Sequence, residues 1–174
     1  ESASNMTTAR IHLTSGIDPA RNLIEHRDTS QAHKTLGLWL TPKGNQDTHY
    51  TESLAKSQRF AKGCIQAPMT RFEPATAYWT MWLPSLTFGF SSLFMNSKQL
   101  DGIQKPMINA ILPKMGYSSK TTRDVVYGPR KYLGIGLRNL EYEQGVQQTL
   151  LLLKHIRANQ KLSELLRISL AWFQ

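Results

Sequence analysis

Lysine and arginine are the residues of this chain whose types and spacing suggest a chemical role. Residues 114–138 form a glycine-rich stretch in which six cations meet one acid, Asp124, so that the local charge is +5. The six are Lys114, Lys120, Arg123, Arg130, Lys131 and Arg138. Loops of this kind can lay arginine side chains and backbone amides along phosphate groups. The stretch therefore predicts a phosphate-binding loop.

A second basic group follows from helical spacing. Apolar residues recur every three or four positions from about Asp47 or Thr48 to Gln66, which predicts a helix. The expected buried face consists of Tyr50, Leu54, Ala61, Cys64 and Ile65. Lys56, Arg59 and Lys62 lie three residues apart, so we expect them on one solvent-facing stripe. Such a stripe is either a surface for phosphates or an ordinary solvated face.

The sequence lacks the residue patterns that metal binding, disulfide formation, dinucleotide binding and serine nucleophile catalysis require. The histidines at positions 12, 26, 33, 49 and 155 are dispersed without neighbouring ligands, and Cys64 is the only cysteine, so we expect no metal site and no disulfide. Gly134-Ile135-Gly136 is not a dinucleotide fingerprint, because Asn139 stands where the third glycine belongs. No serine lies in a nucleophile-elbow setting, and we expect no catalytic residue.

Composition limits the class of protein. With 174 residues and 40% hydrophobic content, the chain can form a globular core. An excess of 21 Lys and Arg over 12 Asp and Glu favours a polyanionic partner such as nucleic acid or an anionic membrane surface. No apolar run reaches the roughly 20 residues that span a bilayer. The single cysteine favours an intracellular protein, nuclear or cytoplasmic and not secreted. Glu1 in place of an initiator Met suggests a fragment.

The elements that position these residues are mainly helices. We expect a buried strand over Leu36–Leu40, with Gly37 at a bulge or a close backbone approach, and a polar segment 1–31 with a short strand near Ile11 and a turn at Gly16–Pro19. A helix over Glu73–Leu83 should begin with a Thr70/Glu73 capping box and stop before Pro84. Ser85–Met95 predicts a buried strand or helical turn.

Three further helices complete the predicted fold. One begins at Asn96-Ser97, bends at Pro106 and closes at Pro113. Its inner face should be Leu100, Ile103, Met107, Ile108 and Ile111. Another runs from Asn139 to about Ile156 with an apolar surface wide enough to need burial on more than one side. The last starts near Gln160, with Leu162, Leu165, Leu166, Ser169 and Trp172-Phe173 inside. The expected class is mainly α, a helical bundle with a small β element at about residues 33–41.

The order of these segments resembles reverse transcriptases of non-LTR retrotransposons, in the part downstream of their catalytic palm motifs. The segments are HKTLGLWLTPKG, AYWTMWLPSLTFGF, INAILPKMGY, VVYGPRKYLGIGLRNLEYEQG and KHIR, within about residues 32–157. By this resemblance, residues 32–44 are the last palm strand and its turn, and 45–157 a thumb-like helical region. Residues 1–31 would be a partly ordered remnant or linker, and 158–174 a truncated C-terminal helix.

The resemblance also assigns individual residues. Lys34, Leu36, Gly37 and Leu38 fall on the strand beside the primer-positioning surface. The thumb-side segment takes Gly128, Pro129, Arg130, Leu133, Gly134, Gly136, Leu137 and Asn139. The chain departs from the family where a Gly-Gly-Leu-Gly turn would stand, because residues 131–135 contain one glycine only.

The catalytic carboxylates of that family have no counterpart. Reverse transcription needs a carboxylate pair that holds two metal ions, and the five Asp residues here (18, 28, 47, 101 and 124) are isolated. The catalytic half, with its Mg²⁺, would precede Glu1, so we expect no cofactor and no catalytic activity in this chain.

The implied function is to bind an RNA–DNA or DNA duplex. The expected partners are this duplex and the remainder of the polymerase, and we expect no membrane partner. Two alternatives remain open. One is a free-standing basic helical adaptor that binds RNA or protein and docks through Trp172-Phe173. The other is a decayed fragment without present function.

Overall fold

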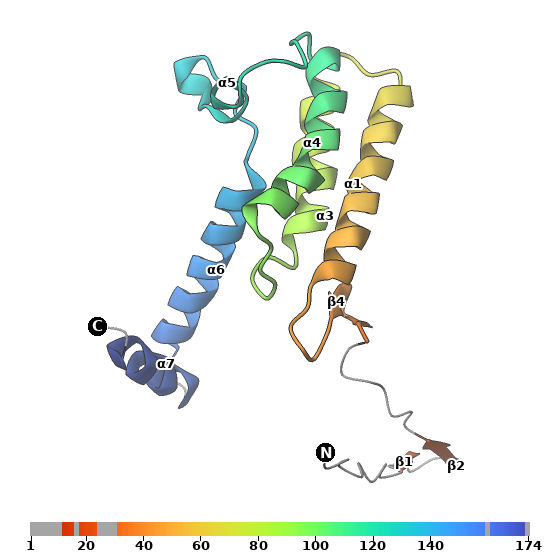
Figure 1. Cartoon of the computed structure of the whole chain (residues 1–174), viewed down its shortest axis with the longest axis vertical. Coiled ribbons are helices and arrows are strands. Elements are labelled where there is room, and N and C mark those ends of the chain that lie inside the picture. Colours follow the sequence, from red (N-terminus) through yellow and green to blue (C-terminus); the bar gives the residue numbers. More distant parts are fainter. Residues whose placement is uncertain (1–11, 16–17, 24–30, 159–160, 173–174) are drawn as a thin grey trace, which may run out of the picture. The chain divides into compact units, whose positions relative to one another are not determined.

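A computed structural model of the chain describes residues 12–15, 18–23, 31–158 and 161–172 (Figure 1). The described residues are mainly helical with two short antiparallel sheets, which confirms the expected fold class. The chain divides into an N-terminal unit, Glu1–Asn45, and a helical unit, Gln46–Gln174. No helix of the described ranges is long and apolar enough to cross a membrane.

Two β-hairpins form the described part of the N-terminal unit. β1 (His12–Ser15) pairs with β2 (Asp18–Leu23), and β3 (His33–Thr35) pairs with β4 (Leu38–Leu40). The strand expected near Ile11 corresponds to β1, although Ile11 itself lies outside the described residues. Of the predicted turn, Gly16 and residue 17 also lie outside them, and the remainder is strand β2.

The predicted buried strand over Leu36–Leu40 is wrong at its start and in its burial, because Leu38 and Trp39 are only half-buried and Leu40 is exposed. Leu36 and Gly37 have φ values of 50° and 89° and connect β3 to β4, so only Leu38–Leu40 is strand. A two-residue hairpin loop of this type requires positive φ at both positions. Leu36 is 88% exposed at the tip. Gly37 therefore marks a turn and not a bulge.

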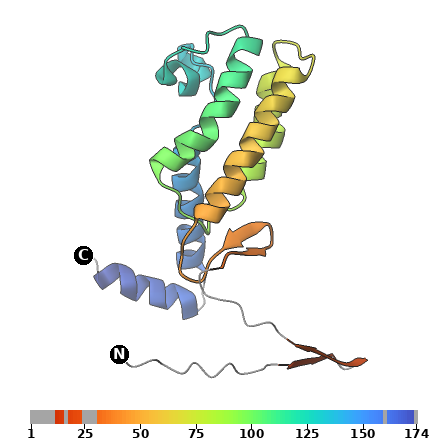
Figure 2. The same cartoon turned by 45° about the vertical axis from the view of Figure 1, so that its right-hand side comes forward.

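The helical unit alternates in direction. α1 (Asp47–Gln66) and α4 (Ser97–Lys114) run parallel and side by side, and the segment α2 (Glu73–Ala77), η1 (Tyr78–Trp82) and α3 (Leu83–Thr87) returns between them in the chain (Figures 1 and 2). α5 (Arg123–Tyr127) and the 3₁₀ turn η2 (Arg130–Tyr132) follow. α6 (Leu140–Arg157) packs on α4 and is followed by α7 (Lys161–Trp172).

α1 confirms the predicted helix and most of its predicted inner face, since Ala61 and Cys64 are buried and Tyr50 and Leu54 pack against the core. Ile65, expected inside, is 61% exposed. The buried residues are mostly small or polar, namely His49, Ser53, Ser57, Ala61 and Cys64. Small side chains allow α4 to approach closely, and a Cβ added to Gly102 of α4 would lie 3.0 Å from the Tyr50 hydroxyl.

Ser57 joins three elements in the core. Its hydroxyl donates to the Ile103 carbonyl of α4 at 2.5 Å and accepts a hydrogen bond from Trp82 Nε1 at 3.1 Å. Trp82 is fully buried and stacks on Tyr78, with 4.7 Å between ring centroids. The aromatic residues of η1 thus serve the core, and the polar atoms that they bury are satisfied.

The helix that begins at Glu73 does not stop before Pro84, contrary to the prediction. A π-helical turn lies just before the proline, in which Leu83 N donates to the Tyr78 carbonyl five residues back. Proline lacks an N–H and crowds the carbonyl four residues earlier, and a wider turn relieves both problems. At the start, Glu73 Oε2 accepts from Thr70 N at 2.6 Å, which is the glutamate half of the predicted capping box.

Ser85–Met95 forms no strand. α3 continues to Thr87, and turns follow, in which Phe90 N donates to the Thr87 carbonyl and Leu93 N to the Gly89 carbonyl. Phe90, Leu93 and Met95 are buried, whereas Phe88 and Phe94 are exposed. The segment therefore begins as helix and continues as turns, which agrees with the helical-turn alternative of the prediction, and it supplies Phe90, Leu93 and Met95 to the core.

α4 is the central helix of the core. Asn96 and Gln99 form a reciprocal capping box, and all five residues predicted for the inner face are buried. Pro106 lies inside the helix, and Pro113 lies in its last turn, which ends at Lys114.

α6 begins at the predicted cap, where the Asn139 side chain accepts from Glu141 N at 2.9 Å. Beyond its first two turns the expected burial is absent from the described part, since Val146, Leu150 and Leu153 are exposed. In α7, Leu165, Ser169 and Trp172 were expected inside but are exposed. The burial predicted for Leu162 and Phe173 lies outside what the structure describes.

Candidate nucleic-acid interface

The basic stretch 114–138, called the basic loop below, is folded and has backbone hydrogen bonds of its own. Ile135 N donates to the Val125 carbonyl at 2.8 Å, and Leu137 N donates to the Val126 carbonyl at 3.0 Å. Val126, Ile135 and Leu137 are buried in the main core. Because α5 and residues 135–137 are thereby joined, the cations between them are held on a fixed backbone.

Two glycines allow the backbone of this loop to cross itself where residue 134 passes residue 128. A Cβ added to Gly134 would lie 2.0 Å from the Gly128 carbonyl oxygen, so the two backbones touch without side chains between them. Leu133, just before the crossing, has φ +64°. Gly128 and Gly134 are two of the residues that the family resemblance assigned to the thumb-side segment. Steric crowding at this contact explains why neither position has a side chain.

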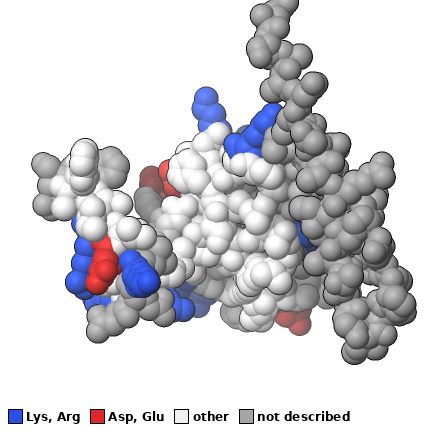
Figure 3. All heavy atoms as spheres, turned by 90° about the horizontal axis from the view of Figure 1, so that it is seen from below, with Lys and Arg blue, Asp and Glu red and all other residues white. Residues whose placement is uncertain are grey.

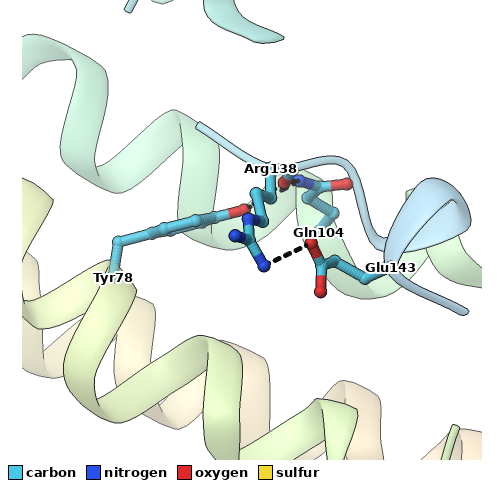
Figure 4. A network of polar contacts seen from close by, with 4 residues as sticks. All are labelled: Tyr78, Gln104, Arg138 and Glu143. Atoms are coloured by element: carbon cyan, nitrogen blue, oxygen red, sulfur yellow. Dashed lines mark hydrogen bonds and ion pairs between the residues drawn. The ribbon is translucent and has the colours of Figure 1, made fainter. Parts of the chain in front are cut away.

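A buried polar network fixes the exit of the loop (Figure 4). The Arg138 carbonyl accepts from the Tyr78 hydroxyl at 2.5 Å and from Gln104 Nε2 at 2.7 Å. Gln104 Nε2 also donates to the Tyr78 hydroxyl, and Gln104 Oε1 accepts from Leu140 N at 3.2 Å. Burial raises the pKa of Tyr78 far above its ordinary value, so the phenol stays protonated and donates.

The Arg138 side chain is already engaged. Its guanidinium forms an ion pair with Glu143 at 2.8 Å (Figure 4). It also lies over the Trp79 ring, 5.1 Å from the centroid. Although the side chain is 56% exposed, its charge is compensated within the fold. We infer that this predicted phosphate ligand mainly anchors the start of α6.

Two predicted lysines also bind the protein itself. Lys56 Nζ donates to the Ser85 carbonyl at 2.9 Å, and Lys114 Nζ donates to the Ala67 carbonyl. Both side chains are half-buried, so the expected solvent-facing stripe is wrong at Lys56. The reason is tertiary: the segment 82–85 packs beside α1, and its carbonyl takes a donor from the expected outer face.

The remaining predicted cations of the helical unit are exposed. They are Arg59, Lys62, Lys120, Arg123, Arg130 and Lys131. None of the six forms an ion pair with a described residue. Arg130 Nε donates to the Ile135 carbonyl at 3.3 Å, and Lys131 lies 5.6 Å from the centroid of the Tyr132 ring. Their charges are thus available to an anion.

The segments that carry these cations meet at one end of the helical unit. The C-terminal ends of α1 and α4 and the whole of α5 lie together at the top of Figure 1, and Figure 2 shows the same grouping. In the view from the opposite end, several Lys and Arg side chains gather at one edge beside Asp or Glu, and others lie apart (Figure 3). The end with α5 is the candidate for an anionic partner, because its exposed loop cations form no ion pair with a described residue.

The remaining predicted residues belong to the N-terminal unit. Lys34 is exposed in β3, Leu36 and Gly37 form the hairpin tip, and Leu38 begins β4. All four therefore lie in one small hairpin.

An open hollow beside the basic loop contains a residue that the sequence prediction missed. It has a volume of about 470 Å³, and Arg71, Phe72, Tyr117, Arg130, Gly134 and Ile135 are among its lining residues. Arg71 lies in the short connection before α2, far in sequence from the basic stretch, and no spacing rule links it to Arg130. The only signal was the pairing of an arginine with an aromatic residue in a linker.

Two other chemistries find no support in the described ranges. Those residues contain no group of three or more His, Cys, Asp or Glu that could hold a metal ion. Cys64 is buried, and burial raises the pKa of its thiol, which disfavours the reactive thiolate.

Comparison of the chain with protein-family models, curated proteins and solved structures gave no match.

Proposed function

We propose that the helical unit binds a nucleic-acid duplex through its backbone phosphates, as the thumb-like part of a non-LTR retrotransposon reverse transcriptase would. The observation that carries the proposal is the basic loop: exposed cations without ion-pair partners among the described residues, on a backbone fixed by core packing. The order of sequence segments supports the same assignment.

The mode of binding follows from the residue types. Lys and Arg side chains at the surface contact phosphates without reading bases, so binding should depend on charge and duplex shape. A preformed loop loses less conformational entropy on binding than a flexible one. The chemistry of polymerisation would reside in carboxylates and Mg²⁺ outside this chain.

Salt dependence tests the proposal with charge-matched variants. The triple variant Lys120→Ala/Arg123→Ala/Lys131→Ala removes three exposed cations of the loop. We expect weaker binding of an RNA–DNA duplex for every sequence, and a salt slope smaller by about 2 to 3.

The control variant Lys98→Ala/Lys105→Ala/Lys154→Ala removes the same charge from exposed positions on α4 and α6. It should keep most of the affinity and the slope. Equal losses in both variants would mean that net charge alone attracts the duplex and that the loop is no specific interface.

A protein-binding adaptor is the second candidate, because α6 and α7 expose Leu150, Leu153 and Trp172. Exposed apolar surface of this kind is typical of interaction sites. The substitutions Leu150→Ser and Leu153→Ser should leave duplex affinity unchanged if the proposed nucleic-acid function is right. If they abolish it, α6 belongs to the nucleic-acid surface.

A further inference from the structure

The hollow beside the basic loop combines two kinds of nucleotide-binding group. Arg71 and Arg130 line it together with Phe72 and Tyr117. Phe72 is 84% exposed and Tyr117 is also exposed, so neither aromatic ring is needed for the core. Aromatic rings stack on nucleobases, and arginine forks bind phosphate groups in a bidentate manner.

A glycine leaves the space that the Arg71 guanidinium occupies. A Cβ added to Gly116 would lie 2.0 Å from Nη2 of Arg71, so the guanidinium occupies the space that any side chain at position 116 would take. Gly116 also has φ +86°, which disfavours other residues. The hollow is thus lined by an arginine placed against the turn that ends α4.

The two guanidinium groups have no carboxylate partner in the described part of the chain. Glu73, the acid nearest to Arg71 in sequence, accepts a hydrogen bond from Thr70 N at 2.6 Å through its carboxylate. Uncompensated cations at the wall of a hollow attract anions. A volume of about 470 Å³ falls within the range of small-ligand pockets, about 300 to 1,000 Å³.

We propose that this hollow binds one unpaired nucleotide of a nucleic-acid strand, with its phosphate on Arg71 and Arg130 and its base stacked on Phe72 or Tyr117. The inference deepens and rests on the proposed duplex binding, because Arg130, Gly134 and Ile135 belong to the basic loop. A single-stranded extension of a bound duplex can therefore enter the hollow from the cationic surface.

The test compares four ligands on the full chain: a blunt RNA–DNA duplex, the same duplex with a short single-stranded extension, the single strand alone, and a free nucleoside monophosphate. We expect the extension to increase affinity about tenfold, which corresponds to one stacked base with its phosphate. Arg71→Ala and the double variant Phe72→Leu/Tyr117→Leu should each remove that gain and leave the affinity for the blunt duplex unchanged.

The control variant Lys120→Ala should weaken both duplexes by the same factor. If the wild type binds both duplexes equally, or if Arg71→Ala keeps the gain, the inference is overturned and the proposed function stands. If the blunt duplex fails to bind while the single strand binds in an Arg71-dependent manner, the proposed function falls and the nucleotide site stands. A free nucleoside monophosphate that binds as tightly as the strand would overturn the strand assignment.

Discussion

At the scale of single residues, Gln104 connects the core to the basic loop. One amide side chain serves the Arg138 carbonyl, the Tyr78 hydroxyl and the Leu140 amide. Such a group is costly to lose, because a buried partner left without a hydrogen bond destabilises a protein by about 1 to 3 kcal/mol.

We therefore predict that Gln104→Leu lowers the free energy of unfolding by about 2 to 3 kcal/mol, chiefly because the Leu140 amide loses its partner. Urea denaturation of the full chain measures the change. The control Gln58→Leu makes the same substitution at an exposed position of α1 and should stay within about 0.5 kcal/mol of the wild type. Similar effects of the two substitutions would contradict the role assigned to the network.

His49 gives a prediction for pH. Burial lowers the pKa of His49, and the charge of Lys56 lowers it further. The unfolded chain takes up a proton near pH 6.5 while the folded chain resists it, so the free energy of unfolding should fall as the pH drops below about 6.5. His49→Gln should reduce this fall, whereas His155→Gln on α6 should keep it. Parallel curves of unfolding free energy against pH for the wild type and His49→Gln would show that His49 is not the titrating group.

At the scale of elements, the glycine crossing sets the geometry of the loop. Gly134→Ala places a Cβ 2.0 Å from the Gly128 carbonyl oxygen, and the backbone must move. We expect destabilisation of about 1 to 3 kcal/mol, as for other overpacked sites, and weaker duplex binding.

A matched control is available in α6. Gly145 has open space where a Cβ would stand, so Gly145→Ala should stabilise the protein by about 0.5 to 1 kcal/mol. Thermal unfolding and duplex titration of both variants check the prediction. If Gly134→Ala unfolds and binds like the wild type, the crossing does not position the loop.

The elements differ in how well their sequences predict them. The helices over 47–66, 97–114 and 140–157 follow from apolar periodicity and from the caps at Asn96 and Asn139, which are local signals. The hairpin at residues 33–40 was missed because a leucine at positive φ is rare and an apolar run suggests continuous strand. The helix was predicted to stop before Pro84, but a π-helical turn accommodates the proline and the helix continues.

At the scale of the whole molecule, the sequence predicts which residues are charged, but it does not predict which charged side chains bind groups within the fold. The sequence predicts ten cations for the interface, but Lys56, Lys114 and Arg138 bind groups that only the tertiary fold brings near them. The burial of α1 differs from the prediction only in part: Ile65 is exposed, and His49, Ser53 and Ser57 are buried in addition to the predicted residues, because only the tertiary fold brings α4 against them. Arg71 comes to lie beside the loop through folding, and no spacing in the sequence links it to Arg130.

We propose that the nucleic-acid surface is the end of the helical unit formed by the basic loop and the C-terminal turns of α1. Amide hydrogen exchange of the full chain, with and without a saturating RNA–DNA duplex, tests it most directly. We expect slower exchange in residues 118–137 and in the last turns of α1, with exchange in α6 beyond Gly145 and in α7 unchanged. Protection confined to α6 and α7, or duplex binding that leaves residues 118–137 unprotected, would contradict it.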